Sequence, residues 1–408
     1  MAENRVKQLL GFDIQQLTDL AKSYGEAGYR GRQLFEAIYR QGRSTLDEIS
    51  TLPAEFRQRL AADFQIGMPG IHRQFESVDG TIRYLITLGD GELVETVWMP
   101  EGDGAEDNAQ EDSEEPSTVP NEMVVSTESP SAMSQPKYQR ATICVSSQIG
   151  CAVNCQFCLT ALLGIRRNLS AGEIVGQILA VLMDRQTGLT GTRNESVTTP
   201  AGESRAGGGP RINLVFMGMG EPFLNYENFM QAVRLLVEGV GIGESRMTVS
   251  TAGIVPRIRD LGQEAVRPKL AISLNASNDE LRNRIMPINR KWNLEALLGA
   301  ARQFPLRPRE RLTFEYVLLD QVNEAEQNAR ELVGLVAGLR AKVNLIALNP
   351  GPGIPFGTPS PERTLRFQEV LVRAGVPTFI RRPRGRDIYA ACGQLKKTMG
   401  RAGDPVIA

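Results

Sequence analysis

The stretch RATICVSSQIGCAVNCQFC, residues 140–158, joins an apolar, β-branched segment to three closely spaced cysteines. The segment ATICVSS is the first of a series, and helical patterns such as AGEIVGQILAVLMDR and YENFMQAVRLLVEG lie between most members. The other expected strands are INLVFMGMG, RMTVSTAG, KLAISLNA, RLTFEYVLL, KVNLIALNP and PTFIRRP. Alternation of strands and helices is typical of a parallel sheet covered by helices. The series predicts an α/β fold, a partial (βα) barrel, with its chemistry where the strands end.

Three of the five cysteines, Cys151, Cys155 and Cys158, form a Cys-x3-Cys-x2-Cys loop after the first expected barrel strand. Spacing this short directs the thiolates to one centre, and soft thiolates select zinc or an iron–sulfur cluster. A structural zinc site takes four protein ligands. The chain offers three candidates for the fourth, none at a finger-like spacing: Cys144, Cys392 and the single histidine, His72. A cubane cluster held by three thiolates instead leaves one iron open to an amine and a carboxylate.

The charge of the chain is unevenly distributed. The 408 residues carry a net charge of −1, but residues 101–135 hold ten Asp or Glu and no Lys or Arg. Removing those ten negative charges from −1 leaves +9 for the rest of the chain. A basic body suits a polyanion such as RNA, although a solvated charged surface explains the same composition.

Composition and cysteine usage predict a protein of the cytoplasm. The hydrophobic content of 41% is enough for a sizeable core, and no run of about 18 apolar residues indicates a membrane span. The start, MAENRVKQLLGFDIQ, lacks the apolar core of a signal peptide. Five cysteines, an odd number, do not resemble a secreted disulfide framework.

Composition and periodicity divide the chain into segments. We expect an N-terminal helical module at 1–66, a β-hairpin connector at 67–100, an acidic disordered insert at 101–137, a barrel at 138–393 with a flexible loop insert at 187–210, and a tail at 394–408. The hairpin is indicated by two alternating segments on either side of GDGE. The helical module is either a structural cap or a docking surface for a large partner.

Polar and glycine-rich signals follow several expected strands, on the rim that also carries the cysteine loop. MGMGEP ends the second strand, and its Gly220 and Glu221 offer a backbone and a carboxylate to an ammonium group. Ser250, Ser273 and Asn349 end later strands and are suited to binding ribose hydroxyls or a carboxylate. Each residue taken alone is also explained as a cap or a turn. Their common position makes them candidate ligands.

The two remaining cysteines map to the same rim. Cys144 lies on the first strand, and Cys392 follows the last one. A lone cysteine is usually a small buried hydrophobe. Four arginines precede Cys392: Arg381, Arg382, Arg384 and Arg386. Because nearby positive charge lowers a thiol pKa, we expect Cys392 to have an increased thiolate fraction.

The cysteine loop, with Phe157 before its last cysteine, resembles that of the radical S-adenosylmethionine (SAM) superfamily. The resemblance implies a radical SAM barrel, in which a [4Fe-4S] cluster binds SAM and yields a 5′-deoxyadenosyl radical. RATICVSSQIGCAVNCQFC, GMGEPFLNY, STAGIVP, LAISLNASND, MPINR and DIYAACGQL together resemble the bacterial family, usually called RlmN, that methylates C2 of adenosine in RNA. The N-terminal pattern LGFDIQQL…GYRGRQLFEAIY is similar too, and the resemblance excludes both inserts.

This resemblance implies a role for each site residue. One SAM methylates Cys392, and the radical from a second removes hydrogen from the S-methyl group, so that a methylene radical adds to adenine C2. Glu95 then takes the C2 proton, and Cys144 attacks Cys392, which frees the base and leaves a transient disulfide. The cluster is held by Cys151, Cys155 and Cys158. The implied SAM contacts are Gly220, Glu221, Ser250, Ser273, Leu274, Asn275 and Asn349.

The resemblance also implies the partners. The substrates are an adenine in the peptidyl-transferase region of 23S rRNA and the adenine 3′ of the tRNA anticodon, and a stacked base must be extruded to react. Lys and Arg on the helical module and near residues 381–386 hold phosphates. We further expect a reducing system such as flavodoxin, no membrane association and a monomer.

Two features depart from the family. Asn275 stands where the family usually has His, and the acidic insert separates Glu95 from Cys144, where the family has a short link. Three alternatives stay open: a sister radical enzyme that methylates adenosine C8, a non-catalytic zinc RNA-binding module, and a paralogue that holds a cluster without turnover. The long helical module favours C2 over C8, and intact Cys144 and Cys392 argue against an inactive paralogue.

Overall fold

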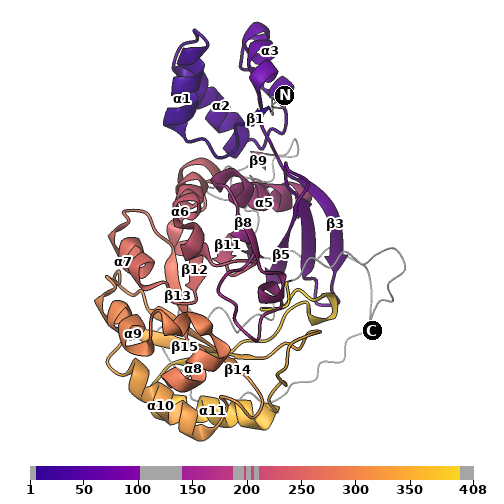
Figure 1. Ribbon diagram of the computed structural model, residues 1–408. Coiled ribbons are helices and arrows are strands. Elements are labelled where there is room, and N and C mark those ends of the chain that lie inside the picture. Colours follow the sequence, from indigo (N-terminus) through magenta and orange to yellow (C-terminus); the bar gives the residue numbers. More distant parts are fainter. Residues whose placement is uncertain (1–5, 102–139, 187–196, 199–203, 206–210, 396–408) are drawn as a thin grey trace.

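The computed structural model describes residues 6–101, 140–186, 197–198, 204–205 and 211–395. A helical module stands at one end of a larger body that is built around a single sheet (Figure 1). In the described ranges this sheet has ten strands, in the order β16-β15-β14-β13-β12-β11-β6-β5-β4-β3. The described helices include none that is long and apolar enough to span a bilayer.

The barrel part of the sheet is parallel and corresponds to the seven strands expected from the sequence. These strands are β6 (Arg140–Cys144), β11 (Arg211–Phe216), β12 (Met247–Thr251), β13 (Lys269–Ser273), β14 (Leu312–Leu318), β15 (Ala341–Ala347) and β16 (Thr378–Ile380). Each pairs in parallel with the next in that order. The predicted α/β partial barrel is therefore confirmed.

Helices cover the outer face of this sheet. They are α5 (Ala171–Asp184), α6 (Tyr226–Leu235), α7 (Val255–Gln263), α8 (Asp279–Ile285), α9 (Leu294–Gln303), α10 (Glu326–Val336) and α11 (Pro361–Arg373). Most of them bury one apolar stripe, but α5 buries nearly every residue. The reason is its position, because α5 and α6 lie between the barrel and the helical module (Figure 1).

Three antiparallel strands extend the sheet beyond β6: β3 (Gly70–Glu76), β4 (Ile82–Thr87) and β5 (Leu93–Glu101). The expected hairpin is β4–β5, and β5 pairs with β6, so that Val97 lies opposite Cys144. β3 was not predicted, because its residues are mostly polar and exposed. Glu101, placed in the acidic insert by its charge, instead ends β5 opposite Arg140. The rest of that insert lies outside the described residues.

The second expected insert, 187–210, is described at four residues. β9 (Val197–Thr198) and β10 (Ser204–Arg205) form a short antiparallel pair. The other positions of this insert, and residues 396–408 of the tail, lie outside the described residues.

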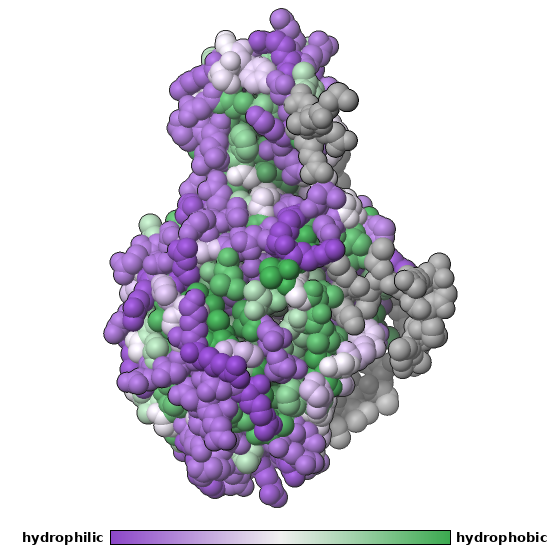
Figure 2. Space-filling model, in the orientation of Figure 1, coloured by the Kyte–Doolittle hydropathy of each residue, from purple (hydrophilic) through white to green (hydrophobic). Residues whose placement is uncertain are grey.

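The helical module contains α1 (Ile14–Ser23), α2 (Tyr29–Tyr39), a 3₁₀ turn (Leu46–Glu48) and α3 (Ala54–Asp63). A parallel pair of β1 (Lys7–Gln8) and β2 (Phe64–Gln65) closes it. Asp13 and Gln16 form a capping box that fixes the start of α1. Figure 2 shows hydrophilic residues over most of the module, whereas hydrophobic residues gather in the middle of the body on this face.

The module sits on the body through close backbone contacts. A Cβ on Gly172 of α5 would lie 2.0 Å from the Leu10 carbonyl oxygen, so only glycine fits there. The Tyr39 hydroxyl accepts a hydrogen bond from Gly11 N–H at 2.8 Å and donates one to the Phe12 carbonyl at 2.9 Å. The module and the barrel therefore share one continuous apolar core.

Candidate active site

The cysteine loop begins and ends in a short antiparallel ladder. β7 (Gln148–Gly150) pairs with β8 (Ile165–Asn168), so residues 151–164 leave and re-enter the body at one place. Gly150 has a left-handed φ of 78°, and a Cβ there would lie 1.7 Å from the Gly164 carbonyl oxygen. The N–H of Cys151 donates to that same oxygen at 3.0 Å. The ladder thus fixes both ends of the loop.

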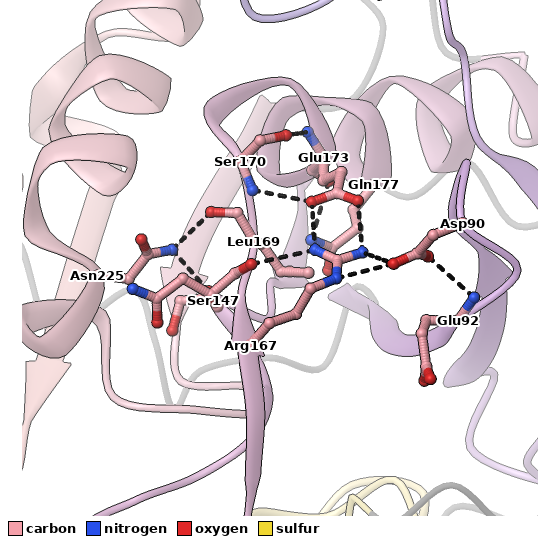
Figure 3. Close-up of polar contacts among 10 residues, drawn as sticks. Asp90, Glu92, Ser147, Arg167, Leu169, Ser170, Glu173, Gln177 and Asn225 are labelled. Atoms are coloured by element: carbon pink, nitrogen blue, oxygen red, sulfur yellow. Dashed lines mark hydrogen bonds and ion pairs between the residues drawn. The ribbon is translucent and has the colours of Figure 1, made fainter. Parts of the chain in front are cut away.

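Figure 3 shows the polar contacts that anchor β8. The Arg167 guanidinium donates two parallel hydrogen bonds to the Glu173 carboxylate, both 2.8 Å long, and one of 2.8 Å to Asp90. Asn225 Nδ2 donates to two backbone carbonyls on either side of the cysteine loop, at 2.8 and 2.7 Å. Because Asp90 lies in the β4–β5 turn and Glu173 in α5, these contacts tie the base of the loop to two neighbouring elements.

The three loop cysteines line one cavity at the carboxyl ends of the strands. The cavity contains about 950 Å³ of space, part of it open to solvent. All three thiols are free and partly buried. Burial is the largest cause that raises each pKa, to about 12 for Cys151 and well above the ordinary thiol value for Cys155, whose two loop partners raise it further. Three thiolates this close together need a metal centre to neutralise them.

The donor set fits a cluster better than a single ion. Among the described residues, no three or more His, Cys, Asp or Glu side chains are arranged around one metal ion. Cubane ligands bind different irons, so they stand further apart than the ligands of one zinc ion. His72, a fourth zinc ligand suggested by the sequence, is exposed on β3 and is not part of the cavity lining.

Gly220 and Glu221 form one wall of this cavity. Gly220 has a φ of 97°, and a Cβ would lie 2.5 Å from the Cβ of Gln148. The Glu221 carboxylate accepts hydrogen bonds from the N–H of Ala252 at 2.7 Å and of Phe223 at 3.1 Å. Burial nevertheless raises the pKa of Glu221 to about 7. A cationic ligand such as an ammonium group would stabilise its charged form.

Ser250 and Ser273 line the cavity together with Glu315, a residue that the sequence analysis missed. The hydroxyl of Ser250 donates to Glu315 Oε2 at 2.6 Å, and that of Ser273 donates to the same oxygen at 3.3 Å. Strand register explains the group, since Ser273 lies directly opposite Glu315 in the β13–β14 ladder. The signal in the sequence was one acidic residue inside the apolar strand RLTFEYVLL. These polar side chains are suited to a ligand that carries hydroxyl groups.

Asn275 and Leu274 are neighbours in the sequence, but only Asn275 lines the cavity. Asn275 lines the cavity with a left-handed φ of 58°, which asparagine tolerates better than most residues. Its side chain is committed to the protein, because Oδ1 accepts from Val317 N–H at 2.8 Å. Leu274 is fully buried and is not part of the lining. Its N–H donates to the Glu315 carbonyl at 2.9 Å, which joins Leu274 to β14.

Asn349 offers an acceptor that the chain does not use. The side chain lines the cavity, and its Nδ2 donates to the Cys392 carbonyl at 3.4 Å. Its buried Oδ1 has no hydrogen-bond partner within the described residues. A buried polar atom without a partner is rare in a folded protein, so a ligand donor is expected to satisfy it.

The segment after β16 carries Cys392 to the cavity, which Cys392 lines beside Cys158. The Gly393 carbonyl accepts a hydrogen bond from Leu159 N–H, next to the last cluster cysteine, at 2.8 Å. Further back, Gly385 N–H donates to Asp79 in the β3–β4 turn at 3.0 Å. The segment is thus held at both ends across the cavity mouth.

Cys144, at the end of β6, is not part of the cavity lining, but it lies near enough to Cys392 for the two thiols to interact electrostatically. The Cys392 thiolate and Glu315 both raise the pKa of Cys144, after burial, which is the largest cause. Although part of Cys392 reaches solvent, the protein packed around its sulfur, followed by Glu315, raises its pKa to about 11. Arg381 does lower this pKa, but by less. The expectation of an increased thiolate fraction at Cys392 is therefore wrong, because burial outweighs the nearby positive charge.

Glu95 lies apart from the cavity lining. It is fully buried in β5 and forms an ion pair with Arg83 of β4. Strand alternation puts Glu95 on the sheet face of Val97, which lies opposite Cys144. The structure therefore places Glu95 on the same side of the sheet as Cys144, and neither residue is part of the cavity lining.

Three cysteines on a clamped loop, a buried carboxylate and a polar rim at the mouth of a partial barrel define a radical SAM enzyme. Residues 145–333 match the Radical SAM superfamily, and residues 7–66 match the ribosomal RNA large subunit methyltransferase N-terminal domain. The chain belongs to the RlmN family of dual-specificity RNA methyltransferases, as its relatives establish.

Two curated relatives and one solved structure resemble the chain over nearly its full length. The probable dual-specificity RNA methyltransferase RlmN of Koribacter versatilis is 58% identical over 92% of this chain and 97% of that protein. The dual-specificity RNA methyltransferase RlmN of Syntrophobacter fumaroxidans is 39% identical over 95% and 98%. A radical SAM methyltransferase from Sphaerobacter thermophilus is 38% identical, with a TM-score of 0.77 over 96% of this chain and 99% of that one.

Family membership decides several of the expectations. The protein is an RNA methyltransferase that uses a [4Fe-4S] cluster and SAM. The non-catalytic zinc module is therefore wrong. In this protein Cys151, Cys155 and Cys158 are the residues whose position fits the cluster, and the Glu221 wall and the polar rim fit SAM.

Proposed function

We propose that the enzyme methylates C2 of adenosine in 23S rRNA and in tRNA, through a methyl group carried on Cys392. The observation that supports this proposal is that Cys392 lines the same cavity as the three cluster cysteines, with Cys144 near enough to interact with it electrostatically. Adenine C2 is electron-poor and does not attack the methyl group of SAM, so a carbon radical must attack it. A relay through a thiol supplies that carbon.

In this proposal Cys392 accepts and activates the methyl group. Its thiolate displaces the methyl group of one SAM, and S-adenosylhomocysteine leaves. When bound, the cluster and a second SAM would supply a 5′-deoxyadenosyl radical, and the S-methyl group on Cys392 would give up one hydrogen atom to it. The methylene radical on Cys392 then forms a carbon–carbon bond to C2.

Release of the product needs a base and a second thiol. We assign Glu95 to the C2 proton from the family resemblance and from its place on the same face of the sheet as Cys144. Once Glu95 has taken the proton, one electron of the adduct would return to the oxidised cluster, when it is bound, and the Cys144 thiolate then attacks the Cys392 sulfur. The carbon–sulfur bond breaks, its electron pair stays on the methylene carbon, and protonation there gives the methyl group. Two electrons from a reductant such as flavodoxin then convert the disulfide back to two thiols.

RNA binding in this proposal uses the basic surface of the chain. Arg32, Arg40 and Arg43 are exposed on the helical module, and Arg382 and Arg386 are exposed after β16. Contacts to phosphates hold and orient RNA without reading its sequence. We further propose that the enzyme works as a monomer in the cytoplasm.

The test is an anaerobic assay of the reconstituted enzyme with 23S rRNA fragments and with tRNA, followed by nucleoside mass spectrometry. We expect 2-methyladenosine from both RNAs and none from Cys392→Ala. If 8-methyladenosine forms instead, the C8 alternative is correct. Normal methylation by Cys392→Ala would rule out the relay.

A further inference from the structure

Arg282 is a fully buried arginine on α8, behind the strand ends that form the cavity. Its guanidinium donates to three backbone carbonyls: Ala252 at 2.7 Å, Leu274 at 3.0 Å and Ser273 at 3.1 Å. It also donates to Asn289 Oδ1 at 3.0 Å. Every one of these acceptors is neutral.

No carboxylate in the described part of the chain lies within ion-pair distance of Arg282. Asp279, on the same helix, instead accepts hydrogen bonds from Asn289 Nδ2 at 2.8 Å and from Leu294 N–H at 2.9 Å. Burial lowers the pKa of Arg282 to about 10, so the guanidinium stays charged at neutral pH. A buried charge without a counter-charge is strongly unfavourable. The folded chain therefore carries a positive charge that its carboxylates do not balance.

The cysteine loop is a second source of negative charge near Arg282, besides Asp279. The N–H of Gln156, next to Cys155, donates to the carbonyl of Ile285 at the end of α8, at 2.9 Å. Ile285 also shares a small apolar cluster with Phe157, against which the loop cysteines pack. Of the acidic groups that act on Arg282, the Cys155 thiolate has the largest effect. Arg282 and the cluster ligands are thus neighbours inside the protein.

We propose that Arg282 is the fixed counter-charge of the iron–sulfur cluster and raises its reduction potential. Three thiolates outweigh the double positive charge of an oxidised [4Fe-4S] core, so the assembly is an anion. Taking up one electron from an external reductant increases that negative charge, and a buried cation stabilises the reduced form more than the oxidised form. Arg282 is a positioning residue in this role, because it acts through the cluster and does not contact the substrate.

Two substitutions of Arg282 separate its charge from its hydrogen bonds. Arg282→Gln removes the charge and keeps a donor, whereas Arg282→Lys keeps the charge. The measurement is the midpoint potential of each reconstituted protein, from an anaerobic redox titration followed by electron paramagnetic resonance. At the wild-type midpoint we expect the ratio of reduced to oxidised cluster to fall about tenfold in Arg282→Gln, a shift of about 59 mV for one electron. Arg282→Lys should stay near the wild type.

A second variant tests the proposal if Arg282→Gln does not fold. Asn289→Asp places a negative charge on the guanidinium without removing it, and should also lower the potential. Arg257→Gln is the control, because Arg257 pairs with Glu227 on the surface, away from the cavity. A wild-type potential in Arg282→Gln, or in Asn289→Asp where the first fails to fold, overturns the proposal. The inference depends on the cluster site and not on the RNA, so nucleoside analysis tests the proposed function separately.

Discussion

Two buried arginines lie at opposite ends of β13 and differ in their partners. Arg267, before the strand, donates two hydrogen bonds to the Glu310 carboxylate at 2.8 and 2.9 Å. Arg282, after the strand, meets only neutral acceptors. The amino end of the barrel is therefore neutralised by the chain itself, whereas the carboxyl end keeps an unbalanced charge. At the amino end, which contributes only to stability, the chain itself pairs the buried charge. At the carboxyl end, which binds cofactors, the buried charge is left for a cofactor to balance.

Other buried polar groups at the carboxyl end resemble Arg282, because the chain does not supply them with a suitable partner. Asn349 has a buried oxygen without a partner in the described structure, and burial raises the pKa of Glu221 to about 7. Both features are unfavourable in the protein alone and become favourable once a donor or a cation is bound. The polar groups that the chain leaves without a partner therefore identify the binding site as clearly as the residue types that line the cavity.

The largest expected effect separates activity from stability at the carboxyl end. Cys144→Ala removes the thiol that frees the product, so methylated nucleoside should disappear and a covalent protein–RNA adduct should accumulate. The free energy of unfolding should change by about 1 kcal/mol or less, because the change removes a single sulfur. Denaturing gels with labelled RNA and urea unfolding measure the two outcomes. Turnover without an adduct would remove Cys144 from the proposed reaction.

The amino end should behave in the opposite way. Glu310→Gln leaves the buried Arg267 without its counter-charge, and breaking such a pair costs about 3–5 kcal/mol. Urea unfolding measures this loss, and the midpoint potential of the cluster should not change. Glu227→Gln is the matched control, because its pair with Arg257 is exposed and should contribute about 1 kcal/mol or less. A loss as small as the control's would show that the amino end does not depend on its ion pair.

The sequence predicted the barrel and the cysteine loop because both are local patterns. Strand periodicity and cysteine spacing are visible within ten or twenty residues. Glu315 was missed because its role depends on register, which brings it beside Ser250 from another strand. Arg282 was missed for a similar reason, since NDELRNRIMPINR contains three arginines and nothing in it shows which one is buried without a carboxylate. Periodicity does not predict contacts between residues that are distant in the sequence.

A smaller effect concerns the charge at the cavity. Glu315 raises the pKa of Cys392, so Glu315→Gln should lower that pKa below its value of about 11. At a fixed pH below that value, Cys392 should then be alkylated between about twofold and tenfold faster. Iodoacetamide labelling across a pH series, followed by mass spectrometry of the peptide that contains Cys392, measures this rate. The exposed Glu227→Gln again serves as the control, and equal rates in the two variants would contradict the assigned effect of Glu315.

The smallest effect is the acid sensitivity of the amino end. Hydrogen bonds from Arg267, together with its charge, hold the pKa of Glu310 below its usual value of 4.5, against the opposing effect of burial. A carboxyl whose pKa is lower in the folded state contributes stability above its unfolded value, and this stability is lost as the pH falls through the folded value. The wild type should therefore lose more unfolding free energy than Glu310→Gln between pH 5 and the acid transition, by about 1.4 kcal/mol for each unit of pKa depression. Urea titrations of both proteins at pH 7, 5 and 4 measure the difference. Parallel pH profiles would mean that Glu310 is not stabilised by Arg267, and the contrast between the two buried arginines would then rest on geometry alone.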